Sequence, residues 1–131
     1  MHLLDTNTLI YFFRRQGQVA RYFSQTESRD VYIPSIALFE LEHGILRSTK
    51  PALQRQGLDE VLQIFKVLDF DYRCAQSAAL IKHTLELSGT PIGHYDLLIA
   101  GMALAHDQQV ITRNTREFAR VPRLRVANWY D

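Results

Sequence analysis

The sequence predicts an α/β fold, a short central parallel β-sheet surrounded by helices, and two observations lead to this prediction. Short apolar runs alternate with longer segments of helical periodicity along the chain. The first apolar run, Leu3-Leu4, ends directly in Asp5 and a polar cluster typical of a helix start. Such alternation favours βαβ units with right-handed crossovers. Since no internal repeat or low-complexity segment occurs, we expect residues 1–131 to form a single domain.

Short apolar runs mark the predicted strands, and several of them end in a polar residue or a proline. In open parallel sheets, ligands bind just beyond the carboxyl ends of the strands, so the polar residues that follow these runs are the first candidates for a site. The predicted strands are Leu3-Leu4, Val31-Tyr32-Ile33, Val67-Leu68-Asp69-Phe70, Val110-Ile111-Thr112 and, at an edge, Leu124-Arg125-Val126.

Helical spacing of apolar residues defines the segments between these strands. We expect Pro51 at the first helical position, and Ser35 and Asp71 as caps of the helices that follow them. The predicted helices are Leu9–Arg15, a short one over Val19–Phe23, Ile36–Leu46, Pro51–Phe65, Ala75–Leu87, one from Gly93 or His94 to Leu104, and a short helix or turn over Asn114–Phe118.

The composition is that of an ordinary globular domain of 131 residues, 47% hydrophobic and 22% charged. A net charge of +1 provides no global basic field, so nucleic-acid binding must use a local patch. Cys74 is the only cysteine, which excludes an internal disulfide. No stretch approaches the roughly 18 apolar residues that span a membrane, and no leader-like segment precedes the first strand. We therefore expect a cytoplasmic protein without membrane contact.

Two aspartates are candidate site residues. Asp5 lies at the carboxyl end of the first predicted strand, although Asp5 or Thr6 could serve only as a helix cap, the commoner use of such residues. Asp96 shares a helical face with Ala100 and Ala103. An acid on a face that should be buried is typical of a functional site, and the alternative is a first-turn acid that the helix dipole favours.

Two pairs of polar residues are less decisive. Glu40 and Glu42 are two residues apart on a predicted helix, so only one can face inward, and Gly44 modestly favours Glu40. A solvated charge is the alternative for both. Asn114 and Glu117 follow the fourth predicted strand, and their spacing also matches a capping box. A cap at the end of a strand can face a site as well, so both interpretations remain open.

With these residues in view, the chain resembles a PIN-domain ribonuclease of the VapC toxin type over essentially its full length. Each motif is short, and their order and spacing, with Trp129 near the end of the chain, make the combination specific. The motifs are Leu4-Asp5-Thr6-Asn7, Glu40-Leu41, Gly89-Thr90-Pro91-Ile92-Gly93-His94-Tyr95-Asp96 leading to Ile99-Ala100-Gly101, and Thr112-Arg113-Asn114-Thr115-Arg116-Glu117-Phe118.

The resemblance implies a PIN-like domain with clustered acids at the strand ends and dependence on Mg²⁺ or Mn²⁺. By position, Asp5, Glu40 and Asp96 are catalytic acids and metal ligands, and Glu117 is an additional catalytic acid. Asn114 stands where many relatives carry Asp, a departure that weakens the expectation of a second metal. The resemblance also implies a structured RNA substrate such as tRNA, a VapB-type antitoxin that plugs the site, a homodimer and larger toxin–antitoxin assemblies.

Carboxylates suit RNA hydrolysis only together with a divalent cation, because a bare acidic cluster would repel the phosphodiester. The metal would lower the pKa of a water molecule and stabilise charge on phosphorus, while one of the acids accepts a proton. The resemblance implies products with a 5′-phosphate and a 3′-hydroxyl. The residues predicted to support the carboxylates are Thr112, Asn114, Thr6 and Asn7.

Arginines beside the last motif are predicted to hold the RNA backbone, which would make binding fall with salt. They are Arg113, Arg116 and Arg120, with Arg123 and Arg125 close by in the sequence. Arg14 and Arg15 end the first predicted helix, where the helix dipole favours cations, so we interpret them as capping residues.

Two other functional classes remain open. One is a catalytically weak PIN-fold binding module that acts mainly in an antitoxin and operator complex, which Asn114 keeps open. The other is a response-regulator-like domain phosphorylated on Asp5, which ranks low because no lysine ends the last strand. The histidines lack zinc-site spacing with a cysteine, and Cys74 is interpreted as a small packing residue.

Overall fold

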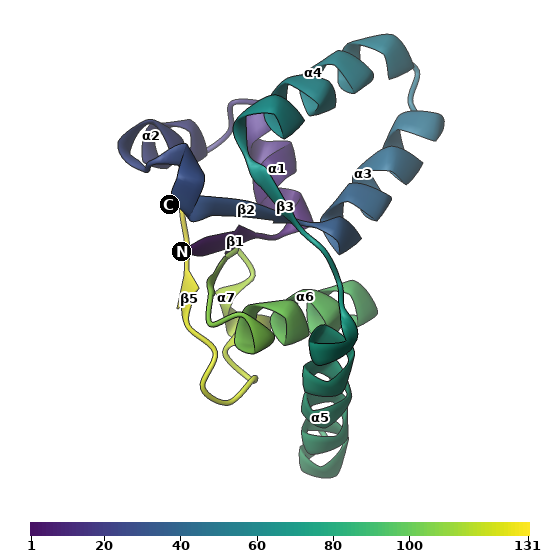
Figure 1. The fold of residues 1–131 in the computed structure, drawn as a ribbon, viewed down its shortest axis with the longest axis vertical. Helices are drawn as coiled ribbons and strands as arrows, with labels where there is room; N and C mark the ends of the chain where they lie inside the picture. Colours follow the sequence, from purple (N-terminus) through teal and green to yellow (C-terminus); the bar gives the residue numbers. More distant parts are fainter.

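The computed structural model describes residues 1–131 and contains one five-stranded sheet with helices around it (Figure 1). The strand order is β3-β2-β1-β4-β5, so the first strand of the chain is the central one. Every pairing is parallel, which confirms the predicted α/β class. The strands are β1 (His2–Leu4), β2 (Val31–Pro34), β3 (Lys66–Leu68), β4 (Gln109–Ile111) and β5 (Val126–Ala127).

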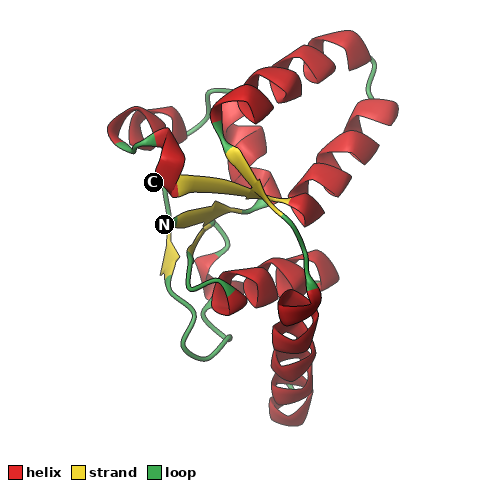
Figure 2. Ribbon diagram, viewed as in Figure 1, coloured by secondary structure: helices red, strands yellow, loops and turns green.

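Helices occupy the connections between the strands and surround the sheet, as Figure 2 shows. α3 and α4 form a hairpin at one end of the molecule, and α5 projects from the other end (Figure 1). None of the helices combines the length and the apolar composition that crossing a bilayer would require. The helices are α1 (Thr6–Phe13), α2 (Val19–Gln25), the 3-10 helix η1 (Ser28–Asp30), α3 (Ser35–Leu46), α4 (Pro51–Ile64), α5 (Tyr72–Ser88), α6 (His94–Ala105) and α7 (Thr115–Phe118).

The central strand β1 is buried on both faces, because successive side chains of a strand point to opposite sides of the sheet. Leu3 packs into one apolar cluster with Met102 and Phe118. Leu4 packs into a second cluster with Leu9 and Trp129. The two-sided burial explains the uninterrupted apolar run, and it also encloses the first polar residue that follows the strand.

Close packing of α5 against α6 depends on small residues. A Cβ atom on Gly101 would lie 2.7 Å from the Cβ of Ala78, so the two helices could not approach this closely with a larger residue there. α5 ends at Ser88 and is capped by Gly89, whose φ of 68° lies in the left-handed region that favours glycine. This packing sets the direction of α6, whose first turn carries Asp96.

Two of the predicted helix starts are confirmed and one is wrong. Pro51 occupies the first turn of α4, and Asp71 caps α5 by accepting a hydrogen bond from Cys74 N. Ser35 does not cap α3, because Pro34 takes the N-cap position. Ser35 Oγ instead accepts a hydrogen bond of 3.0 Å from the backbone N–H of Phe70.

Several element boundaries shift relative to the prediction for identifiable reasons. α1 begins at Thr6 rather than at Leu9, because the residue before it caps the helix. β3 ends at Leu68, since the N–H of Phe70 is taken by a serine side chain. The last strand begins at Val126 because the N–H of Leu124 is engaged in a turn.

Candidate active site

Asp5 follows the central strand and is held from two directions. Its Oδ1 accepts a hydrogen bond of 2.8 Å from Thr8 N, and through this bond Asp5 caps α1. Its Oδ2 accepts a hydrogen bond of 2.6 Å from Thr112 Oγ1. The side chain is 3% exposed. Burial raises the pKa of Asp5, and the hydrogen bonds from Thr112 and Thr8 oppose that rise. Asp5 is thus a helix cap and also a carboxylate at the carboxyl edge of the sheet.

Glu40 and Glu42 point in different directions from α3, as their spacing requires. Thr6 Oγ1 donates a hydrogen bond of 2.5 Å to Glu40 Oε1, which brings Glu40 to the start of α1 beside Asp5. Glu42 faces α4, where it forms a bidentate ion pair with Arg55 at 2.6 and 2.5 Å. Glu40 is therefore the glutamate of α3 that joins the site.

Asp96 lies in the first turn of α6 and is half-buried. Its pKa is raised to about 6, first by burial and then by the negative charges of Asp5, Glu117 and Glu40. The carboxylates that oppose the ionisation of Asp96 in this way come from the residue that follows β1, from α3 and from α7. The structure therefore brings together the four acids named from the sequence.

Asn114 and Glu117 do not form a capping box. Asn114 is the N-cap residue of α7, but its side chain makes no cap hydrogen bond, and its N–H donates to Thr112 Oγ1 at 2.9 Å. Glu117 instead accepts hydrogen bonds of 2.7 Å from Asn114 Nδ2 and from Gly93 N. These two bonds lower the pKa of Glu117, which keeps this carboxylate ionised beside Asp96.

The predicted supporting residues take different positions. Thr112 is fully buried and links Asn114 to Asp5, and Thr6 positions Glu40. Asn7 is exposed and makes no side-chain hydrogen bond. It lines a cavity of about 260 Å³ that reaches Asp5, and the other lining residues are Tyr11, Arg113 and Asn114.

The arginines do not form one continuous patch. Arg113 lines the cavity and is held over the ring of Tyr130, with 3.7 Å between the guanidinium carbon and the ring centroid. Arg116 is exposed, and Arg120 donates a hydrogen bond of 2.8 Å to Pro91 O. The expectation that Arg125 belongs to the same group is wrong. It precedes β5, and it bonds Asp107, which lies before the amino end of β4 and thus at the other end of the strands.

Sequence reasoning missed several contributors to this site. Thr8 and the N–H of Gly93 are hydrogen-bond donors to site carboxylates, and Tyr130 is the platform beneath Arg113. Backbone donors leave no residue-type signal. Tyr130 lies far from Arg113 in the sequence, so only the tertiary structure brings them together.

The donor set of the site consists of carboxylates with amide and hydroxyl neighbours. Such oxygen-only sets fit hard divalent cations, above all Mg²⁺, which keeps several of its own water molecules. No three of the site carboxylates lie within 4.8 Å of one another, and the one group of ligand-type side chains that does is elsewhere in the fold.

Comparisons with known proteins show which family the chain is similar to. The model of the PIN domain family matches residues 2–124. The tRNA(fMet)-specific endonuclease VapC of Salmonella typhimurium is 34% identical over 127 residues, which cover 97% of this chain and 96% of that protein. The chain is thus similar to this relative from end to end.

Solved structures show the same similarity. The DNA-bound VapBC of Salmonella typhimurium superimposes with a TM-score of 0.92 at 35% identity, covering 98% of this chain and 97% of that one. VapBC2 of Rickettsia felis, bound to a DNA fragment from the promoter, gives a TM-score of 0.91 at 31% identity, with 98% of both chains covered. The chain therefore belongs to the PIN domain family. Within that family it is of the VapC type, as its sequence motifs predicted.

Proposed function

We propose that this protein is a divalent-metal-dependent endoribonuclease and the toxin of a type II toxin–antitoxin pair. The observation that carries the proposal is the meeting of Asp5, Glu40, Asp96 and Glu117 at the carboxyl ends of the strands, where burial and then the charges of the other three acids raise the pKa of Asp96 to about 6. An acidic cluster of this kind, built around the buried Asp5, calls for a cation. The nuclease names of the relatives support the same reaction class.

Each acid has a distinct part in the proposed reaction. Asp5, Glu40 and Asp96 would hold Mg²⁺ or Mn²⁺, and this ion would supply water activation and charge stabilisation at phosphorus. Thr112 and Thr8 orient the carboxylate of Asp5 toward the opening. A carboxylate of the cluster takes the proton of the attacking water, and water attack would leave a 5′-phosphate and a 3′-hydroxyl.

The proposed substrate is a structured RNA such as tRNA. Arg113 lines the cavity above Asp5 with its guanidinium fixed over Tyr130, so its N–H groups are available to a phosphate at the site entrance. Arg116 is exposed on α7 and extends the positive charge outward. The name of the Salmonella relative, a tRNA(fMet)-specific endonuclease, supports tRNA as the substrate class.

A VapB-type antitoxin is the proposed partner, in a homodimeric toxin assembly that acts in the cytoplasm. Phe39 and Tyr95 are 49% and 46% exposed and contact each other edge to face, immediately beside Glu40 and Asp96 in the sequence. This aromatic pair offers an apolar anchor for a partner that covers the acids. The VapBC complexes among the similar structures support such a partner.

Glu40 and Glu42 provide a matched test of the catalytic proposal, because they are the same residue type on one helix and only Glu40 joins the site. With purified protein, total tRNA and Mg²⁺ or Mn²⁺, we expect cleavage that EDTA stops. Glu40→Gln and Asp5→Ala should lower the rate at least 100-fold, whereas Glu42→Gln should stay within about threefold of wild type. If wild type and Asp5→Ala are equally inert, the binding-module alternative replaces the enzyme.

The toxin role has a separate test. Expression of the wild-type protein should arrest growth, and expression of Asp5→Ala should not. Co-expression of the neighbouring gene should restore growth. Cleavage in vitro without growth arrest would leave a ribonuclease and remove the toxin assignment, whereas mapping of cleaved ends in whole-cell RNA would identify the substrate.

A further inference from the structure

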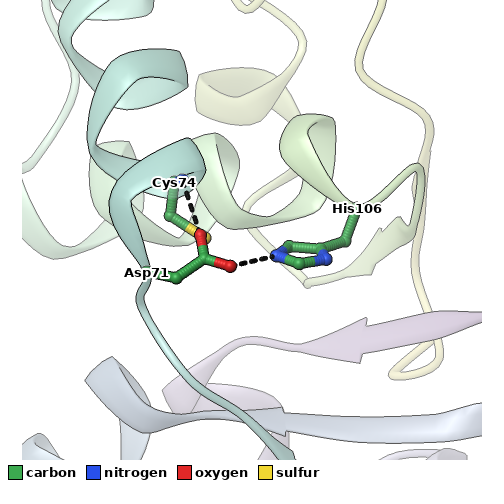
Figure 3. Close-up of side chains that lie close together, drawn as sticks. All are labelled: Asp71, Cys74 and His106. Carbon is green, nitrogen blue, oxygen red and sulfur yellow. Dashed lines mark hydrogen bonds and ion pairs between the residues drawn. The ribbon is translucent and has the colours of Figure 1, made fainter.

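A second group of ligand-type side chains lies far from the acids, where the start of α5 meets the end of α6 (Figure 3). Asp71 is the N-cap of α5, Cys74 lies in the first turn of that helix, and His106 is the C-cap of α6. Each offers one ligand atom, and these atoms all lie within 4.8 Å of one another. In Figure 3 the Asp71 carboxylate points toward the His106 ring, and the Cys74 side chain lies beside the carboxylate.

One separation matches that which a metal ion imposes, and Cys74 Sγ lies within 4.8 Å of both other ligand atoms. Asp71 Oδ2 lies 3.3 Å from His106 Nε2, and an oxygen and a nitrogen on tetrahedral zinc are about 3.4 Å apart for bonds of about 2.1 Å. Asp71 uses its other oxygen, Oδ1, to accept the cap hydrogen bond of 2.9 Å from Cys74 N. The cap and a metal bond can therefore exist at the same time.

Two of the three ligand atoms have no strong partner within the protein. His106 Nε2 is buried and makes no hydrogen bond of proper geometry, although it approaches Asp71. Cys74 is fully buried, and its Sγ makes only a long contact of 3.8 Å to Asp69 O. An ion at the centre would satisfy both atoms, whereas a buried polar atom without a partner costs free energy.

We propose that Asp71, Cys74 and His106 form a binding site for Zn²⁺ or a similar borderline transition-metal ion, with a water molecule as the fourth ligand. A sulfur, a nitrogen and an oxygen are donors that select zinc over the magnesium that an all-oxygen site prefers. The Asp71 side chain is 47% exposed, which gives the ion a path from solvent. Binding would release the thiol proton of Cys74 to water, since the thiolate is the ligand.

The proposed site is independent of the acidic site. Asp96 opens α6 and His106 closes it, and ten residues of helix separate them by about 15 Å. A zinc ion would join α5 to α6 at one end of their contact, and it would leave the acids at the other end free for magnesium. We therefore expect zinc to raise the stability of the folded chain without replacing the catalytic metal.

Cobalt is the probe for a test on the untagged, full-length protein after EDTA treatment and dialysis. One equivalent of Co²⁺ should give a thiolate-to-cobalt charge-transfer band in the near ultraviolet, and one equivalent of Zn²⁺ should abolish it. Cys74→Ala should lose the band. His106→Gln and Asp71→Asn, which preserves a capping side chain, should weaken binding tenfold or more.

Matched controls separate this site from others. His83→Gln alters an exposed histidine of α5, and Glu40→Gln alters the acidic site, so both variants should keep the band and the affinity of wild type. Circular dichroism of the metal-free variants checks folding, and Asp71→Asn carries the test if Cys74→Ala does not fold. Cobalt binding without a thiolate band overturns the proposal, as does binding that is unchanged in both His106→Gln and Asp71→Asn.

Discussion

Thr112 Oγ1 donates a hydrogen bond of 2.6 Å to Asp5 Oδ2, although the two residues are 107 positions apart in the chain. The same hydroxyl accepts a hydrogen bond from Asn114 N, so its single proton is directed at the aspartate. This contact joins the ends of β1 and β4, which are neighbours in the sheet. The hydroxyl of Thr112 also donates to the ionised form of the buried Asp5 carboxylate, and this bond opposes the rise in the pKa of Asp5.

Replacement of this hydroxyl should therefore affect both stability and pH dependence. We expect Thr112→Val to lose about 1–3 kcal/mol of unfolding free energy in urea titrations, because a buried carboxylate loses a donor. The pKa of Asp5 should rise further, which moves the acidic limb of the pH–rate profile to higher pH. Thr112→Ser keeps the hydroxyl and should restore the profile. A Val variant with unchanged pH dependence would show that the bond does not tune Asp5.

The raised pKa of Asp96 predicts how the stability of the metal-free protein changes with pH. Because the folded-state pKa is about 6 against an ordinary value of 3.8, the folded chain binds more protons than the unfolded chain between these values. Its unfolding free energy should thus fall as pH rises through this interval. In EDTA at pH 7.5, Asp96→Asn should be more stable than wild type by about 1 kcal/mol, a figure reduced for solvent screening.

The difference between wild type and Asp96→Asn should shrink toward pH 4, where the wild-type carboxyl is protonated as well. Urea unfolding at the two pH values measures it, and saturating Mg²⁺ should stabilise wild type more than the variant. Equal destabilisation of Asp96→Asn at both pH values would show that the folded chain does not hold Asp96 at a raised pKa.

Asn114 should limit metal binding at the acidic site. Its amide donates to Glu117, whereas an aspartate there would remove this donor and add a charge. Asn114→Asp should therefore raise the pKa of Glu117. In calorimetry it should increase the Mn²⁺ affinity by about threefold or more, or add a second bound ion. Asn114→Ala removes the donor without adding a ligand and serves as the control. Identical Mn²⁺ binding in Asn114→Asp and Asn114→Ala would contradict this role.

Arg113 and Arg125 form a matched pair for RNA binding. They carry the same charge, but Arg113 follows the carboxyl end of β4, whereas Arg125 precedes the amino end of β5 and bonds Asp107. In the catalytically silent Asp5→Ala background, Arg113→Gln should weaken tRNA binding and reduce the slope of log affinity against log salt by about one unit. Arg125→Gln should change neither quantity. Equal losses for the two variants would indicate a diffuse electrostatic effect.

Much of this architecture follows from local sequence. The apolar runs ending at Leu4 and Ile111 marked buried strands, because a strand covered on both faces has no polar side to interrupt it. The cap at Asp71 and the first-turn position of Pro51 followed from residue type, since their effects act within one helical turn. The conflict between Asp96 and its apolar helical face predicted a functional site at that residue.

Tertiary structure decided the features that depend on distant partners. Spacing allowed a capping box at Asn114 and a cap at Ser35, but Thr112 and Phe70 engage these residues instead. The group of Asp71, Cys74 and His106 shows no zinc spacing, because its members come from two helices.

Residue order thus specified which segments are strands and helices and marked Asp5 and Asp96 as candidate site acids, since both properties depend on neighbours within a few positions. The direction of each donor, the separation of Arg125 from Arg113 and the meeting of Cys74 with His106 depend on how helices pack against the sheet. Packing joins residues that lie far apart along the chain, and no local pattern encodes such contacts.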